Sequence, residues 1–115
     1  MQRGEVRMVD FEPARGAEAN KRRPAIIVSN DEANSTAAQI GRGVLTVVPV
    51  TSNVDRVYPF QVLLPSGTGG LPHDSKAQAE QVRSIDAERV GALLGSLPDR
   101  LMASLDEALR LHLAL

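Results

Sequence analysis

The sequence predicts an α+β domain in which a small barrel or strongly curled sheet comes first and a helix comes last. Short segments rich in β-branched or alternating apolar residues fill most of the chain and are separated by loops rich in glycine and proline. The apolar period then changes to that of a helix near the C-terminus. A length of 115 residues matches one ordinary domain, and we expect a single domain over residues 1–115.

The N-terminal part predicts two strands that flank a polar loop. EVRMVDF (5–11) alternates in part and indicates the first strand. Residues 12–23 include a proline, a glycine and several charged residues, so we expect an exposed, mobile loop. PAIIVSN (24–30) indicates the second strand, because Pro24 can open a strand without removing a central ladder bond. Residues 30–43 lack a sustained period and predict a loop with at most one helical turn.

Three further strands are expected between residues 44 and 85. VLTVVPVT (44–51) is the strongest strand signal, and its nearly continuous apolar character indicates burial on both faces, with Pro49 marking an edge or a bulge. Residues 58–64 and 76–85 are the other two segments. The glycine-rich and proline-rich stretch between them predicts a loop.

The C-terminal third indicates helices. A short helix is expected after Asp86, and a longer one is expected to have Ser96 as its N-cap, with Pro98 in its first turn and Asp99 three residues after the cap. Its apolar stripe comprises Leu101, Leu105, Ala108, Leu109, His112 and Leu113.

The residue types present narrow the possible chemistry. The chain has no cysteine, which excludes disulfides and thiolate catalysis. The two histidines, His73 and His112, share no ligand motif, so neither a metal nor another cofactor is expected. A triad of a serine with His73 and an acid stays open, although no Gly-x-Ser-x-Gly turn is present. No apolar run has the length of a signal peptide or a membrane span, and we expect a cytoplasmic protein without a membrane partner.

A basic cluster, Lys21 to Arg23, stands directly before Pro24. Such a cluster is commonly only solvated, and Lys21 and Arg22 are interpreted as mobile contacts on the loop. Arg23 differs, because a residue before proline is restricted to extended conformations, and a held guanidinium suits a phosphate. Thr51 and Ser52 lie at the end of a predicted strand. Their hydroxyls could either bond nearby backbone amides in a turn or bind a phosphate, and the spacing alone does not distinguish these two interpretations.

Several stretches, taken in order, resemble the MazF/PemK family of toxin endoribonucleases. Residues 3–31 resemble the opening strand, acidic loop and Arg-Pro strand of that family, and VPVTSN (48–53) resembles the strand end that carries its active threonine. YPFQVLL, HDS, EQVRSID and LDEALRLHL follow in the same order. The resemblance implies an SH3-like β-barrel, or curled antiparallel sheet, with a C-terminal helix, and a homodimer that is neutralised by a cognate MazE-like antitoxin. It also implies sequence-specific, metal-independent cleavage of single-stranded RNA to a 2′,3′-cyclic phosphate and a 5′-hydroxyl, which inhibits translation and growth; the target is mRNA, with tRNA and rRNA left open.

The family's functional positions fall on residues of this chain. Its catalytic arginine corresponds to Arg23, its catalytic threonine to Thr51 and the acid of its first loop to Glu18. The predicted substrate-binding residues are Ser52, Asn53, His73, Asp74, Ser75, Gln81 and Lys21. Many relatives have arginine where this chain has His73, so the general acid and base stay unassigned, with Glu18 and His73 as the titratable candidates.

The chemistry of the residues agrees with this resemblance. If the 2′-hydroxyl of the RNA is the nucleophile, the protein has to supply charge stabilisation and proton transfer and needs no activated serine, cysteine or metal-bound water. Arginine stays protonated and is a poor base. Phe11, Tyr58 and Phe60 are the only aromatic residues, so recognition of bases should depend on hydrogen bonds rather than on an extended stacking surface. Tyr58 and Phe60 are interpreted as packing residues of the core or the dimer.

Two alternatives come from other functional classes. One is a non-catalytic toxin of the same fold that binds and poisons a protein target such as DNA gyrase. The other is an SH3-like module for proline-rich ligands, which would need an aromatic-lined groove. The joint presence of Arg23 and Thr51 favours the endoribonuclease.

Overall fold

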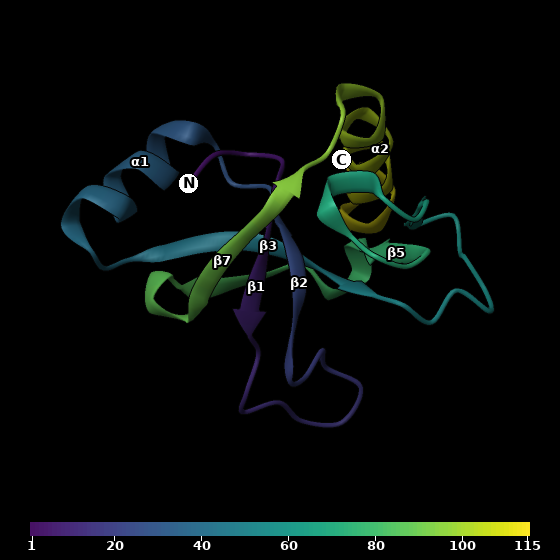
Figure 1. Ribbon diagram of the computed structural model, residues 1–115, viewed down its shortest axis with the longest axis horizontal. Coiled ribbons are helices and arrows are strands. Elements are labelled where there is room, and N and C mark those ends of the chain that lie inside the picture. Colours follow the sequence, from purple (N-terminus) through teal and green to yellow (C-terminus); the bar gives the residue numbers. More distant parts are fainter.

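The computed structural model describes residues 1–115 and has one curled antiparallel sheet with two helices (Figure 1). The strand order is β4-β5-β3-β2-β1-β7, and β6 pairs with β3 outside this path. The strands are β1 (Glu5–Asp10), β2 (Arg22–Ile27), β3 (Val44–Thr51), β4 (Gln61–Leu64), β5 (Ser75–Gln78), β6 (Arg83–Asp86) and β7 (Val90–Ser96), and the helices are α1 (Asp31–Ile40) and α2 (Asp99–Leu113). The predicted fold class is confirmed, although the hydrogen-bonded sheet does not close into a barrel.

The central strand β3 carries apolar side chains on both faces, as the sequence predicts. Val48 belongs to a core cluster that includes Leu105 of α2, whereas its neighbour Val47 belongs to a second cluster around Phe11. On one edge β3 pairs with β2, and on the other edge it pairs first with β6 and then with β5. Pro49 lies where the partner changes from β6 to β5, so its missing N–H falls at a break in the ladder.

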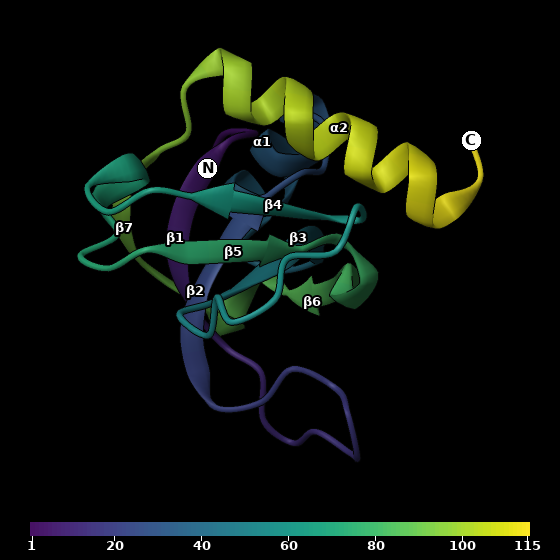
Figure 2. The same cartoon turned by 90° about the vertical axis from the view of Figure 1, so that its right-hand side faces the viewer.

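The helix α2 covers the first of these core clusters and packs beside β4 (Figure 2) and against the 3₁₀ turn at Ala79–Gln81. Leu101, Leu105 and Ala108 of the predicted stripe are buried, whereas His112 and Leu113 near the C-terminal end are exposed. The predicted N-cap is wrong: Ser96 ends β7, and Pro98 occupies the cap position without a side-chain bond. Neither helix is long and apolar enough to cross a membrane.

Two elements differ from the sequence expectation. Residues 31–40 form the helix α1 rather than a loop: the Asn30 side chain accepts a hydrogen bond from the Ala33 N–H at 2.8 Å, and Gly41 ends the helix in the left-handed region at φ 73°. The short helix expected after Asp86 is a single 3₁₀ turn followed by β7, which pairs with β1. Gly95 permits this arrangement, because a Cβ there would lie 2.6 Å from the Gly69 carbonyl carbon.

The segment expected to be one strand over residues 76–85 is divided. It forms β5, a 3₁₀ turn at Ala79–Gln81, and β6, with β5 and β6 pairing with different parts of β3. The loop between β1 and β2 projects from the end of the sheet opposite α2 (Figures 1 and 2). This loop and the end of β3 position the candidate site.

Candidate active site

A cleft of about 290 Å³ lies where the start of β2, the end of β3 and the segment before β5 meet. The antiparallel register explains this meeting: Ala25 lies opposite Pro49, which brings Arg23 to the level of Thr51. Thr51 also pairs with Lys76 of β5, so the residues just before Lys76 approach the same point. The lining residues are Lys21, Arg22, Arg23, Pro24, Val50, Thr51, Ser52, Leu71, Pro72, His73 and Ser75.

The wall of the cleft is cationic. Lys21, Arg22 and Arg23 contribute to it, and no carboxylate is among the lining residues. His73 is the remaining titratable side chain of the wall. The chain as a whole has a formal charge of -1, so the positive charge is concentrated at this cleft and is not a general property of the surface. This local excess of cations favours an anionic ligand in the cleft.

Arg23 is half-buried and is held by the β1–β2 loop. Its Nε donates to the Asn20 backbone oxygen and its Nη2 donates to Asn20 Oδ1, each at 2.8 Å. The sequence placed Arg23 just before a strand, whereas it is the second residue of β2 and lies opposite Val9. Strand pairing fixes the Arg23 backbone, and Asn20 restrains its guanidinium.

Thr51 and its neighbours combine turn bonding with an available hydroxyl. Thr51 Oγ1 accepts a hydrogen bond from the Asn53 N–H at 3.2 Å, and its own proton is not used by that bond. Ser52 lines the cleft and is exposed. Asn53 does not line it, and its Oδ1 accepts from the Asp55 N–H at 3.2 Å. The two interpretations of Thr51, as a turn residue and as a phosphate donor, are therefore compatible.

The segment before β5 supplies a third wall. His73 is exposed and lines the cleft. Ser75 also lines it but is only 4% exposed, and its hydroxyl donates to the His73 carbonyl at 2.9 Å. Asp74 lies outside the wall, where its carboxylate accepts from the Ser66 N–H at 2.8 Å. Ser75 and Asp74 thus shape this segment.

Glu18 and Gln81 are not brought into the cleft. Glu18 is exposed on the β1–β2 loop, and its Oε1 accepts from the Arg15 N–H at 2.9 Å. The Gln81 amide holds that loop: its oxygen accepts from the Ala19 N–H at 2.9 Å and its nitrogen donates to the Ala17 carbonyl at 2.8 Å. The two residues that Gln81 contacts, Ala17 and Ala19, are the chain neighbours of Glu18.

The loop is anchored at several points, in contrast to the mobile loop that the sequence indicates. Lys21 adopts a left-handed conformation at φ 63°, its N–H donates to Glu12 Oε1 at 2.7 Å, and its carbonyl accepts from the Phe11 N–H at 2.9 Å. Arg22 begins β2 opposite Asp10. The backbones of Lys21 and Arg22 are therefore bonded in place.

Sequence reasoning missed Arg22 as a residue of the cleft wall and Asn20 as the partner of Arg23. The basic cluster contained the signal for Arg22. No sequence signal pointed to Asn20, because its position depends on the unusual conformation of Lys21.

The fold brings together no group of three or more His, Asp or Glu side chains that could hold a metal ion.

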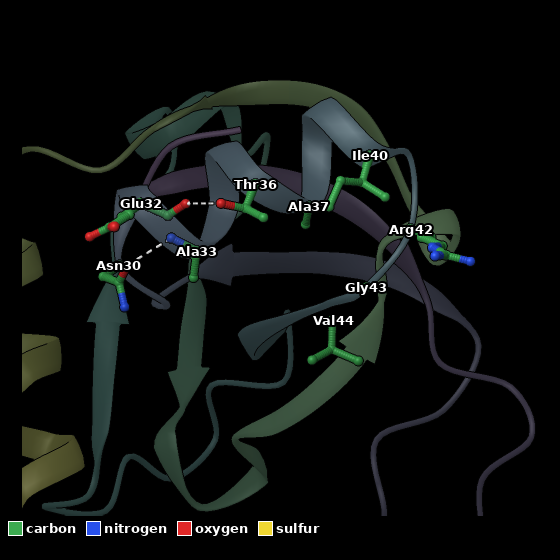
Figure 3. A pocket seen from close by; sticks show the side chains of 9 residues that line it. All are labelled: Asn30, Glu32, Ala33, Thr36, Ala37, Ile40, Arg42, Gly43 and Val44. Carbon is green, nitrogen blue, oxygen red and sulfur yellow. Dashed lines mark hydrogen bonds between the residues drawn. The ribbon is translucent and has the colours of Figure 1, made fainter.

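A larger hollow of about 600 Å³ lies between α1 and the start of β3 (Figure 3). Its polar groups serve the helix itself: Asn30 accepts from the Ala33 N–H and the Thr36 hydroxyl donates to the Glu32 carbonyl. Ile40 and Val44 are apolar and more than half exposed, and Glu32 and Arg42 are its only charged residues. The smaller cleft, where cations and hydroxyls converge, is the better candidate.

Comparison with known proteins gives consistent matches over the whole chain. The family described as PemK-like, MazF-like toxin of type II toxin-antitoxin system matches residues 2–113. Endoribonuclease MazF9 of Mycobacterium tuberculosis is 61% identical over 115 residues, which cover 100% of this chain and 98% of that protein.

Solved structures agree in fold. A crystal structure of MazF from Deinococcus radiodurans superposes with a TM-score of 0.82 at 28% identity, over 100% of this chain and 97% of that one. A MazE–MazF crystal structure from the same organism gives a TM-score of 0.76 at 26% identity, over 100% of this chain and 96% of that one.

Proposed function

The chain belongs to the family of PemK-like, MazF-like toxins of type II toxin-antitoxin systems, and we propose that it is an endoribonuclease that cleaves single-stranded RNA in the cationic cleft. The observation that carries this proposal is the convergence of Arg23, Thr51 and His73 on one cleft without a carboxylate. The 61% identity to a named endoribonuclease over the full chain supports it independently.

In the proposed reaction, the RNA supplies its own nucleophile. The 2′-oxygen loses its proton and attacks the adjacent phosphorus, and the bond from phosphorus to the 5′-oxygen breaks. The products are a 2′,3′-cyclic phosphate and a 5′-hydroxyl, the latter formed when the leaving oxygen takes up a proton. No metal-bound water is needed for this sequence of steps.

Arg23 and Thr51 serve the phosphate in this scheme. The free donors of the Arg23 guanidinium stabilise the negative charge that develops on the five-coordinate phosphorus. The Thr51 hydroxyl donates to a non-bridging oxygen, since its proton is not used by the turn. Lys21, Arg22 and Ser52 hold the flanking phosphates and the sugar.

Proton transfer is assigned to His73. It lies in the cleft wall, and imidazole can both accept and donate a proton near neutral pH. Glu18 lies outside the cleft in one protomer, so a role for its carboxylate would require movement of the loop or a second subunit.

Membership of this toxin family also suggests which proteins the chain binds. A relative of known structure is a complex of MazE with MazF, which supports a cognate MazE-like antitoxin for this toxin. We also propose a homodimer and a cytoplasmic location, where mRNA is translated. Cleavage of mRNA would inhibit translation and thereby growth.

The test uses purified protein and a long single-stranded RNA in excess chelator. The wild type and the control Arg42→Ala, which removes an exposed arginine beside the other hollow, should both cleave. Arg23→Ala should lose about a hundredfold or more in rate. Equal cleavage by Arg23→Ala, or cleavage by the wild type only after a divalent metal is restored, would contradict the proposal.

A further inference from the structure

Asn20 makes two hydrogen bonds to a single guanidinium. Its backbone oxygen accepts from Arg23 Nε and its side-chain Oδ1 accepts from Arg23 Nη2, both at 2.8 Å. Together these bonds occupy the edge of the guanidinium formed by Nε and Nη2. The planar group is therefore fixed in rotation as well as in position.

The bonds leave a defined set of donors for a ligand. A guanidinium has five N–H groups, and Asn20 uses one on Nε and one on Nη2. The two on Nη1 and the second on Nη2 remain. One N–H from each of these two nitrogens lies along the adjacent Nη1–Nη2 edge, which suits two oxygens of a phosphate. Arg23 lines the cleft, and no other bond to its guanidinium is present.

The side chain that binds Arg23 is a neutral amide and not a carboxylate. Its carbonyl oxygen orients the cation without cancelling its charge, whereas a carboxylate would form an ion pair and compete with the phosphate. Asn20 is therefore suited to holding Arg23 while leaving its full positive charge available.

Asn20 is itself held on both sides. The preceding Ala19 is buried, and its N–H is bonded to Gln81. The backbone of the following Lys21, which adopts the left-handed region, is bonded to the Phe11 N–H and to the Glu12 carboxylate. This turn directs the backbone carbonyl and the side chain of Asn20 to the same arginine.

We propose that Asn20 is a positioning residue that presents the Nη1–Nη2 edge of Arg23 to the scissile phosphate. This inference rests on the proposed function, since it assigns Asn20 a part in the same cleavage step. It acts through Arg23 and not through contact with the RNA.

The kinetic test compares Asn20→Ala with Gln39→Ala, which removes an exposed amide on α1. Asn20→Ala should lower kcat by about ten- to a hundredfold, because a misplaced group loses rate on this scale, and should change KM by less than twofold. Gln39→Ala should leave both unchanged. In an Arg23→Lys background, Asn20→Ala should have less than a twofold further effect, because lysine lacks the edge that Asn20 binds.

A spectroscopic test needs neither RNA nor activity. In ¹⁵N–¹H spectra of the wild type, the Arg23 Nε–H signal should be protected from exchange with water, and rotation of its Nη2 group should be slow. In Asn20→Ala the Nη2 rotation should become fast, while Gln39→Ala retains the wild-type signal. Unchanged Arg23 signals in Asn20→Ala would overturn the inference even if that variant were destabilised.

The outcomes separate this inference from the proposed function. If Arg23→Ala is inactive and Asn20→Ala has wild-type kcat, the positioning role is wrong and the proposed function stands. An equal loss from Asn20→Ala with and without Arg23 would also overturn the role. If Arg23→Ala cleaves normally, the proposed function itself fails.

Discussion

At the scale of single residues, Arg23 and Thr51 come together from positions that are distant in sequence. Their meeting follows from the antiparallel register of β2 and β3, in which Ala25 faces Pro49. Each side chain has local partners that leave donors free: Asn20 holds one edge of Arg23, and the Asn53 N–H bonds Thr51 Oγ1 without using its proton. The pair can therefore donate to an anion without first breaking existing bonds.

The role of the Thr51 hydroxyl can be tested by a substitution at that residue. Thr51→Val preserves the side-chain shape but removes the hydroxyl, and a hydrogen bond to a charged group contributes about 1.5–3 kcal/mol. We expect the cleavage rate to fall on the order of tenfold to a hundredfold, whereas Thr51→Ser should stay near the wild-type rate. Single-turnover cleavage at saturating protein checks this. A Thr51→Val variant as active as Thr51→Ser would show that the hydroxyl does not serve the reaction.

Glu5 gives a prediction on pH. Burial by itself raises the pKa of Glu5, but the hydrogen bond from Arg7 Nε at 2.8 Å, a bond with the Gln2 backbone and the charges of Arg7 and the N-terminus together lower that pKa below its usual 4.5. Because the folded-state pKa is depressed, the stabilisation is present above the unfolded-state pKa and is lost as the pH falls through the folded-state pKa.

The corresponding measurement is urea unfolding of Glu5→Gln at several pH values. The variant should lose about 0.5 kcal/mol of unfolding free energy at pH 7, the scale of a partly exposed ion pair, and the loss should disappear in strong acid. Glu32→Gln, which replaces an exposed carboxylate on α1, is the control. A loss for Glu5→Gln that persists unchanged in acid would contradict the role of its charge.

The site residues were predictable to different degrees. Arg23, Thr51, Ser52 and His73 stand at recognisable places beside strand ends, and the structure brings them to one cleft. The positions of Glu18 and Gln81 were not predictable, because they depend on how the β1–β2 loop folds back on the 3₁₀ turn before β6. Their expected roles in catalysis and RNA binding stay predictions.

At the scale of elements, the β1–β2 loop is the part that most affects the site. It carries Asn20 and Lys21, and the Gln81 side chain ties it to the body of the protein through Ala17 and Ala19. Burial of Ala19 beside Phe11 adds an apolar contact. The loop is thus positioned by a residue far from it in the sequence.

Gln81→Ala should therefore loosen the loop. It removes both bonds to the loop backbone, and we expect amide hydrogen exchange at Ala19 to increase by about tenfold, as expected for the loss of about 1.4 kcal/mol of local stability. Exchange in β3 should not change, and Gln39→Ala should match the wild type. Wild-type protection of Ala19 in Gln81→Ala would show that the loop is held by other contacts.

The elements that sequence reasoning identified wrongly share a physical cause. α1 has little apolar character, and its ends are set by Asn30 and Gly41 rather than by a hydrophobic stripe. β7 reads as helical by its leucines, but pairing with β1 and the close approach of Gly95 to Gly69 decide its conformation. Strands such as β3, with continuous β-branched runs and a buried position, were predictable because local preference and tertiary environment agree.

At the scale of the whole molecule, a nearly neutral chain presents one local excess of positive charge. The formal charge is -1, yet Lys21, Arg22 and Arg23 line a cleft without a carboxylate. Binding of RNA should therefore depend on a few phosphate contacts rather than on a long basic surface.

This distribution predicts a modest salt dependence. The cleft wall has three cations, Lys21, Arg22 and Arg23. If each binds one phosphate, log K for a non-cleavable single-stranded oligonucleotide should fall with log salt concentration with a slope of about −2, since each contact contributes about −0.7. Arg22→Ala should reduce the slope by about 0.7. Fluorescence anisotropy titrations at several salt concentrations measure this, and a slope of about −5 would mean that cations outside the cleft contribute.

A modified substrate decides whether the RNA provides the nucleophile and the protein stabilises the resulting phosphate. An oligonucleotide with one mapped cleavage site is compared with the same oligonucleotide carrying a single 2′-deoxynucleotide on the 5′ side of the scissile bond, both in chelator. We expect the ribonucleotide substrate to yield a 2′,3′-cyclic phosphate and a 5′-hydroxyl, and the deoxy substrate to stay intact at that bond. Cleavage of the deoxy substrate at the same position, or a 5′-phosphate on the product, would show that the 2′-hydroxyl of the RNA is not the nucleophile.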